Sequence, residues 1–203
     1  MLKPLLTEAR MVTFTERQGN FVIMVGGPAS GKDFVVNNLI DIQAKEINPD
    51  HTLERIAAIN NINLADASQV YGLHLHLKPK LDKFFNTFIR QQRKTLANVV
   101  LNKTGSDYAQ IQSLISILKN LGYQVTVVYV QTTLKTALSR NMTRNRRVPS
   151  EVVIKKWTDA RNTYEKLLKL ADHAWVVDNE APWTVMGTDG KYKRDSTRIT
   201  KIK

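Results

Sequence analysis

The chain has 203 residues, of which 42% are apolar and 24% are charged, a composition typical of a globular protein that can bury a core. It contains no cysteine, which excludes disulfides and thiolate metal sites, and no apolar run reaches the roughly 18 residues of a membrane helix. The net charge of +12 favours an anionic partner such as a nucleotide or a nucleic acid, and leaves open a basic protein that binds neither.

The pattern along the chain begins with a weakly organised stretch, residues 1–20, which predicts an N-terminal arm. Apolar runs and alternating positions then predict strands at 21–25, 53–59, 71–77, 98–102, 124–130 and 174–177. Apolar residues at helical spacing predict helices at 33–46, 81–96, 107–121, 134–144 and 151–170. The first of these helices is predicted to stop at Asn48-Pro49-Asp50.

This alternation of strands and helices predicts an α/β domain over residues 21–186, with a mainly parallel sheet flanked by helices. Ligands of such sheets bind at the carboxyl ends of the strands. The tail, residues 187–203, carries six Lys and Arg against two Asp and is predicted to be a flexible, solvated end, with nucleic-acid binding as the alternative. No signal peptide is recognisable at the N-terminus, so we expect a cytoplasmic protein without membrane contact.

A glycine-rich stretch follows the first predicted strand and opens the first predicted helix. Gly26, Gly31 and Lys32 match the spacing G-x-x-x-x-G-K of a phosphate-binding loop, in the strand-loop-helix context that the motif requires. Backbone N–H groups of such a loop surround phosphate oxygens, and Lys32 is expected to reach the β- and γ-phosphates. The residues expected to bind the nucleotide are Gly26, Gly27, Pro28, Ala29, Ser30, Gly31 and Lys32.

The residue after Lys32 departs from the motif, because Asp33 stands where Ser or Thr normally binds magnesium. A carboxylate can also hold Mg²⁺, directly or through water. Asp33 is therefore a candidate metal ligand, with help from Asp107 or Asp66. The alternative is that Asp33 only supports the start of the helix, where negative charge is favoured.

A cluster of arginines follows the strand predicted at 124–130, with Arg140 and Arg144 four residues apart on one helix face. Arg146 and Arg147 fall where the helix gives way to a loop. Arginines on such a segment can neutralise phosphate charge in a transition state. A solvated basic face or a nucleic-acid patch explains the composition equally well.

Together these stretches resemble the P-loop kinases of the zeta-toxin and polynucleotide-kinase-like group, and most closely small kinase-like proteins of tailed bacteriophages. The resemblance rests on VIMVGGPASGKDF, NVVLNKTG, GYQVTVVYVQTTLKTALSRNMTRNRRVP and LADHAWVVDN. It implies a P-loop NTPase-type fold, ATP and Mg²⁺ as cofactors, and a lid that carries Arg140, Arg144 and Arg146. It also implies that Asn179 lies near the base or the phosphate loop.

Two departures from this group concern acids. Asn102 stands at the end of the third predicted strand, where the group usually has Asp. Asn60 and Asn61 stand where an acid is expected to take the proton of the accepting hydroxyl, and Asp66 is the nearest carboxylate. An amide cannot act as a general base and is a poorer magnesium ligand.

Two functions therefore remain open. The first is an active kinase that transfers the γ-phosphate of ATP to a nucleotide, a nucleic-acid end or a sugar nucleotide, with Lys32, the three arginines and Asp66 in the catalytic roles. The second is a catalytically impaired kinase-fold protein that binds nucleic acid or a larger assembly such as a phage virion.

Overall fold

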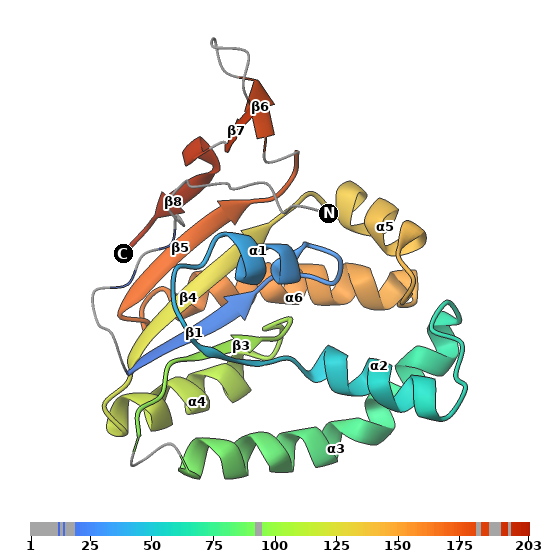
Figure 1. Ribbon diagram of the computed structural model, residues 1–203, viewed down its shortest axis with the longest axis horizontal. Helices are drawn as coiled ribbons and strands as arrows, with labels where there is room; N and C mark the ends of the chain where they lie inside the picture. The colour runs from blue at the N-terminus through green and yellow to red at the C-terminus, as the bar shows by residue number, and fades with distance from the viewer. Residues whose placement is uncertain are drawn as a thin grey trace.

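The computed structural model describes residues 12, 14, 19–91, 95–181, 184–186, 192–194 and 196–203. Its main sheet has six strands in the order β2-β3-β1-β4-β5-β8 (Figure 1). Their bounds are β1 Asn20–Val25, β2 Lys45–Ile47, β3 Val99–Asn102, β4 Gln124–Gln131, β5 His173–Asp178 and β8 Ile199–Lys201. Strands β1 to β5 run parallel to their neighbours, and β8 runs antiparallel to β5.

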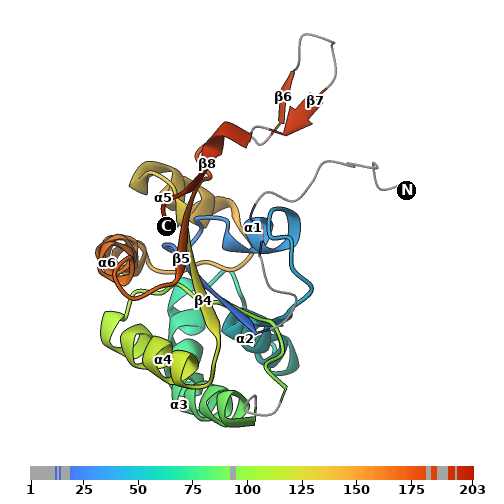
Figure 2. The same ribbon diagram turned by 90° about the vertical axis from the view of Figure 1, so that its left-hand side faces the viewer.

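Helices lie on both faces of this sheet, with α4 and α6 on one side and α1 on the other (Figure 2). Their bounds are α1 Lys32–Asn38, α2 Pro49–Ile59, α3 Ala67–Gln91, α4 Tyr108–Asn120, α5 Leu134–Thr143 and α6 Ser150–Leu167. A short 3₁₀ helix, η2 (Ser196–Arg198), precedes β8, and the strands β6 (Thr184–Met186) and β7 (Tyr192–Arg194) form a separate two-stranded ribbon.

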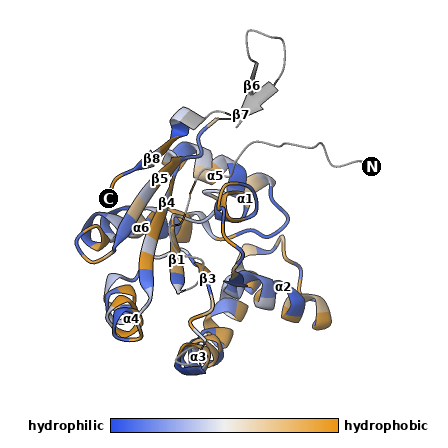
Figure 3. Ribbon diagram, turned by 60° about the vertical axis from the view of Figure 1, so that its left-hand side comes forward, coloured by the Kyte–Doolittle hydropathy of each residue, from blue (hydrophilic) through white to orange (hydrophobic). Residues whose placement is uncertain are grey.

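The central strands are apolar on both faces, as parallel strands covered by helices have to be (Figure 3). Alternate side chains of β1 enter two different cores. Phe21, Ile23 and Val25 pack with residues of α3, α4 and α6, whereas Val22 and Met24 pack with residues of α1. The expected α/β fold with a mainly parallel, helix-flanked sheet is therefore present, and the carboxyl ends of β1, β3 and β4 meet at one edge.

The first difference from the sequence prediction concerns the helix expected at 33–46. It ends at Asn38, and residues 45–47 form β2, which pairs with β3 at the edge of the sheet. The stop predicted at Asn48 is instead the start of α2. The side chain of Asn48 accepts a hydrogen bond from the Asp50 backbone N–H at 3.0 Å, and Pro49 occupies the first turn, where its missing N–H costs nothing.

Two predicted strands are wrong, because both segments are helical. Residues 53–59 belong to α2, which buries only Leu53 and Ala57, and residues 71–77 lie inside the long helix α3. The alternation at 71–77 was misleading because α3 buries Val70 and Leu77, two full turns apart, and leaves Leu75 half exposed. The helix expected at 81–96 corresponds to the second half of α3, which ends at Gln91.

The two termini differ from their predictions where they are described. The end of the tail is not flexible throughout, because β8 pairs with β5 through Val177 and Ile199, and Lys203 Nζ donates to the Ala171 carbonyl at 2.6 Å. Within the expected arm, Val12 is fully buried and bridges to Ile40. The remaining predictions, of an arm at 1–20 and a solvated tail at 187–195, concern residues that lie largely outside the described ranges. No helix in the described ranges is long and apolar enough to cross a membrane.

Candidate active site

The glycine-rich loop joins β1 to α1 and lies between β4 and α6. Gly27 faces α6 so closely that an added Cβ would lie 3.1 Å from the Cα and Cβ atoms of Trp157. Ala29 and Gly31 both have left-handed backbone, with φ of 61° and 88°. Alternation of this kind turns successive N–H groups toward one concave surface, which is how backbone binds anions. The loop therefore has the shape that phosphate binding requires.

Lys32 folds back over this loop. Its Nζ donates to the carbonyl oxygens of Gly26 and Gly27, each at 3.0 Å. Burial lowers the pKa of Lys32 to about 8, although the nearby carboxylates of Asp50 and Asp33 oppose that shift. The ammonium group thus lies at the loop with its charge only partly compensated, which favours an added anion.

Asn179, which follows β5, holds the other side of the loop. Its Nδ2 donates to the Ser30 carbonyl at 2.6 Å, and its backbone N–H donates to the Gln131 carbonyl at 2.8 Å. A Cβ on Gly31 would lie 2.1 Å from Asn179 Nδ2, so this contact requires glycine. Asn179 therefore lies at the phosphate loop, which is one of the two places that the resemblance implied, and its hydrogen bond holds the loop at Ser30.

The three arginines predicted to neutralise phosphate all line a cavity of about 280 Å³ above the loop. Arg140 Nη2 donates to the Glu180 carbonyl at 3.3 Å, and Arg144 Nη2 donates to Asn141 Oδ1 at 2.9 Å. Burial lowers the pKa of the Arg144 guanidinium, and the positive charge of Arg146 lowers it further. Whether this segment moves as a lid stays a prediction.

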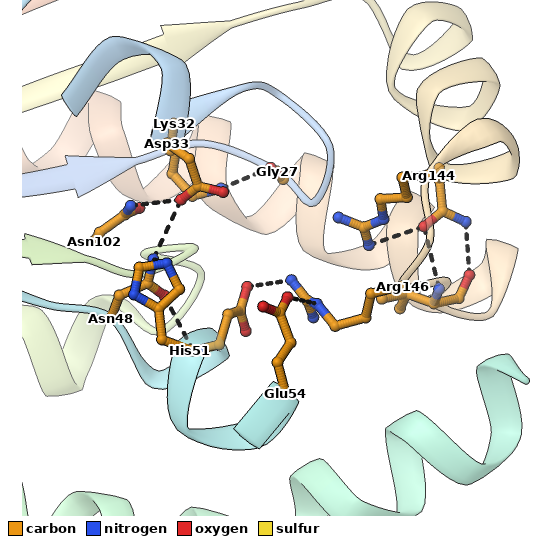
Figure 4. A network of polar contacts seen from close by, with 12 residues as sticks. Gly27, Lys32, Asp33, Asn48, His51, Glu54, Asn102, Arg144 and Arg146 are labelled. Carbon is orange, nitrogen blue, oxygen red and sulfur yellow. Dashed lines mark hydrogen bonds and ion pairs between the residues drawn. The ribbon is translucent and has the colours of Figure 1, made fainter. Parts of the chain in front are cut away.

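Arg146 has a different environment from the other two arginines, because it pairs with acids of α2 (Figure 4). It forms an ion pair with Asp50, and its Nε lies 3.1 Å from Glu54 Oε1. Only 15% of the Arg146 side chain is exposed. The arginine segment is thereby attached to α2 across the cavity.

Opposite the arginines, Asp33 belongs to a cluster of acids and amides. Asp33 Oδ1 accepts from Asn102 Nδ2 at 2.7 Å and from Asn48 Nδ2 at 3.2 Å (Figure 4). The same two amide groups donate to Glu46 Oε1, at 2.8 Å and 3.2 Å. The ends of β2 and β3 thus bring Glu46, Asn102 and Asp33 together beside the loop.

A second cavity, of about 270 Å³, adjoins the first. Asp50, Asn102 and Lys156 line both of them, so the two cavities meet beside Lys32. Burial lowers the pKa of Lys156 below the usual lysine value. In the first cavity the cations Lys32, Arg140, Arg144, Arg146 and Lys156 face the acids Asp33 and Asp50, which leaves an excess of positive charge.

Comparisons with known proteins agree with this geometry. The AAA domain model matches residues 21–167, which is most of the chain. The chain belongs to the AAA domain family. No curated protein matches its sequence.

Solved structures resemble this AAA domain in fold. A chain from the PezAT chromosomal toxin-antitoxin system of Streptococcus pneumoniae is 14% identical with a TM-score of 0.60, and the match covers 90% of this chain and 72% of that chain. The AvrRxo1-ORF1:-ORF2 complex with ATP gives 15% identity and a TM-score of 0.55, covering 91% of this chain and 61% of that chain. At these identities the likeness shows a shared fold and nothing finer.

Two acids predicted to serve the site, Asp66 and Asp107, lie outside the cavity above the loop. Asp66 precedes α3 and accepts from the backbone N–H groups of Ser68 and Gln69, at 3.0 and 3.1 Å. It lines neither of the two cavities beside the loop. Asp107 caps α4 by accepting from the Gln110 N–H at 3.1 Å, and it lines the second cavity without reaching the first. The hydrogen bond from the Gln69 backbone N–H lowers the pKa of the Asp66 carboxyl below its usual value, and burial opposes this shift only in part.

Asn60 and Asn61, the positions at which the sequence led us to expect the catalytic base, do not follow the second strand of the sheet. Asn60 and Asn61 lie at the end of α2, where Asn60 Nδ2 donates to the Ile56 carbonyl at 2.8 Å. The second strand is β2, and the first carboxylate after it is Asp50. The sequence reading missed Glu46 and Asp50 because it extended the first helix through β2. The Asn-Pro-Asp start signal was the clue that could have located them.

Proposed function

We propose that this protein is a kinase that transfers the γ-phosphate of ATP to a hydroxyl group. The ATP phosphates would lie on Gly26–Lys32 under the arginines, and the acceptor would occupy the adjoining cavity. The γ-phosphorus bond to the β-phosphate oxygen breaks as its bond to the acceptor oxygen forms, and ADP leaves. Positioning and charge neutralisation supply most of the catalysis in such reactions.

The observation that carries this proposal is the position of Asp50. It lines both cavities, next to Lys32 and beyond the loop, so it would lie between donor and acceptor. Asp50 is also the first carboxylate after β2, the position where the resembling kinases carry their base. We assign it the role of accepting the proton of the attacking hydroxyl. Phosphate that draws Arg146 out of its ion pair would leave Asp50 free for this role.

The acceptor class follows from charge. The second cavity has Lys78, Lys103 and Lys156 in its lining, so the acceptor would itself carry phosphate. A nucleotide, a nucleic-acid end and a sugar nucleotide meet this requirement. ATP is the expected phosphate donor, and Mg²⁺ is the ion expected to bind with it. A cytoplasmic location and a relation to proteins of tailed phages are also part of this proposal.

One observation favours the alternative of an impaired kinase that binds nucleic acid. The net charge is +12, and the described end of the tail carries Arg198, Lys201 and Lys203. Such a protein would bind oligonucleotides with a strong salt dependence and without ATP. The test of the kinase proposal also decides between the two.

The experiment is a screen for transfer of radiolabelled γ-phosphate to nucleotides, 5′-hydroxyl oligonucleotides and nucleotide sugars. We expect one acceptor class to be labelled by the wild type, and Asp50→Asn to reduce the rate by about a hundredfold or more. Asp66→Asn is the matched control, because asparagine also caps helices, and it should keep the rate. A rate unchanged by Asp50→Asn would overturn the assignment of the base.

The ion pair of Asp50 needs its own control. Glu54→Gln removes the other acid bonded to Arg146 and leaves Asp50 in place. This variant should transfer phosphate at close to the wild-type rate if Asp50 acts as a base. If Glu54→Gln and Asp50→Asn lose activity equally, the acids serve only to hold Arg146. No labelled acceptor, together with ATP binding that Lys32→Ala leaves unchanged, would favour the impaired kinase.

A further inference from the structure

Two carboxylates beside the loop share their hydrogen-bond donors. Asp33 Oδ1 and Glu46 Oε1 each accept from Asn102 Nδ2, at 2.7 and 2.8 Å, and each accept from Asn48 Nδ2, at 3.2 Å. Two oxygens that bind the same two nitrogens have to lie close together. Asp33 comes from the start of α1 and Glu46 from β2, so the fold brings them together from different parts of the chain.

This acidic pair, Asp33 and Glu46, has no cationic partner among the described residues. No Lys, Arg or His nitrogen of the described ranges lies within 4.0 Å of either carboxylate. The nearest basic groups are otherwise engaged, since Lys32 bonds to loop carbonyls and Arg146 to acids of α2. Like charges in such proximity repel, and a divalent cation would relieve the repulsion.

The residues also meet the needs of Mg²⁺, the ion that the fold implies. Magnesium in nucleotide sites is held by one or two carboxylates together with phosphate oxygens of the substrate. Asp33 lines the cavity above the loop, whereas Glu46 lines a different cavity, and no described group donates to Asp33 Oδ2 or to Glu46 Oε2. Each carboxylate therefore keeps one oxygen without a donor, and the one on Asp33 belongs to the cavity in which the phosphates would lie.

The usual arrangement in P-loop proteins pairs a Ser or Thr after the lysine with an acid on a neighbouring strand. In this chain the acid is Asp33, after the lysine, and the strand residue is the amide Asn102, which donates to it. We propose that the two positions have exchanged roles, so that Asp33 holds the magnesium of ATP and Asn102 orients it. Glu46 supplies a second carboxylate from β2, a position outside the loop motif.

This inference rests on the proposed binding of ATP, and one titration separates the two. Calorimetry of ATP binding without an acceptor, in EDTA and then in excess Mg²⁺, is compared for the wild type, Asp33→Ser, Glu46→Gln and Asn102→Asp. Lys32→Ala serves as the binding-deficient control. Thermal unfolding of each variant shows whether it is folded.

We expect Mg²⁺ to tighten ATP binding to the wild type by about tenfold or more, which is about 1.4 kcal/mol. Asp33→Ser should lose most of that gain and Glu46→Gln part of it, while binding in EDTA stays the same or improves because a negative charge has gone. Asn102→Asp adds a third carboxylate and should weaken binding in EDTA. The double variant Asp33→Ser with Asn102→Asp restores the usual pair and should recover the Mg²⁺ gain.

Bound Mn²⁺ gives a readout that does not depend on turnover. Binding weakens the sharp electron paramagnetic resonance signal of free Mn²⁺, so with protein and ATP this signal should be larger for Asp33→Ser than for the wild type and return to the wild-type level in the double variant. An Mg²⁺ gain that is the same in the wild type, Asp33→Ser and Glu46→Gln would overturn the inference and leave ATP binding intact. Absence of ATP binding to the wild type in both conditions would instead overturn the proposed function itself.

Discussion

The loop side of the site comes from one continuous segment, Gly26–Lys32, whereas the acidic side is assembled from the start of α1, β3 and α2, with Glu46 of β2 hydrogen-bonded to Asn102 beside the cavity. On the loop side the backbone forms the site, because left-handed residues shape the loop and its carbonyl oxygens accept hydrogen bonds from Lys32. On the acidic side only side chains are involved, and they meet because parallel strands end at one edge of the sheet. Substitutions on the loop side should therefore change the fold and its stability, whereas substitutions on the acidic side should mainly change metal binding and catalysis.

The largest effect is expected on the loop side, for Gly31→Ala. A left-handed backbone costs a residue with a Cβ about 1–2 kcal/mol, and the new Cβ would displace Asn179 Nδ2 from the Ser30 carbonyl. We expect a loss of about 2–3 kcal/mol in the free energy of unfolding, measured by urea denaturation, together with weaker ATP binding. Gly72→Ala is the matched control, because Gly72 is exposed on α3 with no atom within 4 Å of an added Cβ, and it should be neutral or stabilising.

Alkaline pH should weaken ATP binding through Lys32. Phosphate favours the charged ammonium, and the pKa of Lys32 in the free protein is about 8. Affinity should therefore be constant well below pH 8 and fall as the pH rises through that value, by about tenfold between pH 7 and pH 9. Calorimetry across this range checks it. Lys32→Arg, which stays charged, should bind with a flat profile, and a flat profile in the wild type would contradict the expected titration.

Lys32 has the opposite effect on stability. Because burial lowers its pKa from 10.5 to about 8, the unfolded chain binds more protons than the folded chain between these values. Its contribution to the free energy of unfolding is thus least favourable below about pH 8 and improves toward pH 10.5. Urea denaturation of the wild type and Lys32→Met across this range isolates that contribution.

Arg146→Met tests the connection between the two sides. Arg146 is mostly buried, but its partners Asp50 and Glu54 are 45% and 43% exposed, so solvent screens the pairs. We expect a loss of about 1 kcal/mol in the free energy of unfolding. Arg147→Met, at an exposed neighbouring side chain, should change it by less than about 0.5 kcal/mol. Equal losses in the two variants would mean that the ion pairs do not stabilise the fold.

An effect no larger than that of Arg146→Met is expected at Asn48, which both caps α2 and donates to the acidic pair. Asn48→Ser keeps a capping oxygen and loses the donor, whereas Asn48→Ala loses both. We expect Asn48→Ala to lower the free energy of unfolding by about 1 kcal/mol and Asn48→Ser by less than half of that. Thermal unfolding with and without Mg²⁺ measures both. A larger loss for Asn48→Ser than for Asn48→Ala would show that the cap is not the main contribution.

The sequence predicted the loop side well because its signals are local. The spacing of Gly26, Gly31 and Lys32 defines the loop, and the apolar run before them defines the buried strand. The strands β3, β4 and β5 and the helices α4 to α6 were also predicted close to their bounds, because they combine strong apolar patterns with clear ends. Asn179 was placed near the loop through family resemblance alone.

The acidic side could not be predicted in the same way, because it depends on which strands are neighbours. β2 has three residues, KEI, and none of the apolar length that identifies a strand. Because β2 was not predicted, Glu46 was not assigned to the sheet edge, and the sequence pointed to Asn60 and Asn61 where the structure has Asp50 as the first carboxylate after β2. In the function that we propose, Asp50 is the acid that the sequence analysis took to be missing. Asn102 is a true departure, and its amide bonds to both acids of the pair.

Asn179 and Glu180 are adjacent in the chain but hold different parts of the site. Asn179 bonds to the phosphate loop, and the Glu180 carboxylate accepts from Thr133 N at 2.7 Å and Thr133 Oγ1 at 2.8 Å, and also from Thr136 Oγ1, at the first turn of α5. One dipeptide therefore connects α5 to the loop through hydrogen bonds. We expect α5 to keep its position when a ligand binds, so that any closing movement has its hinge after Thr143 and its travel in the segment that carries Arg146.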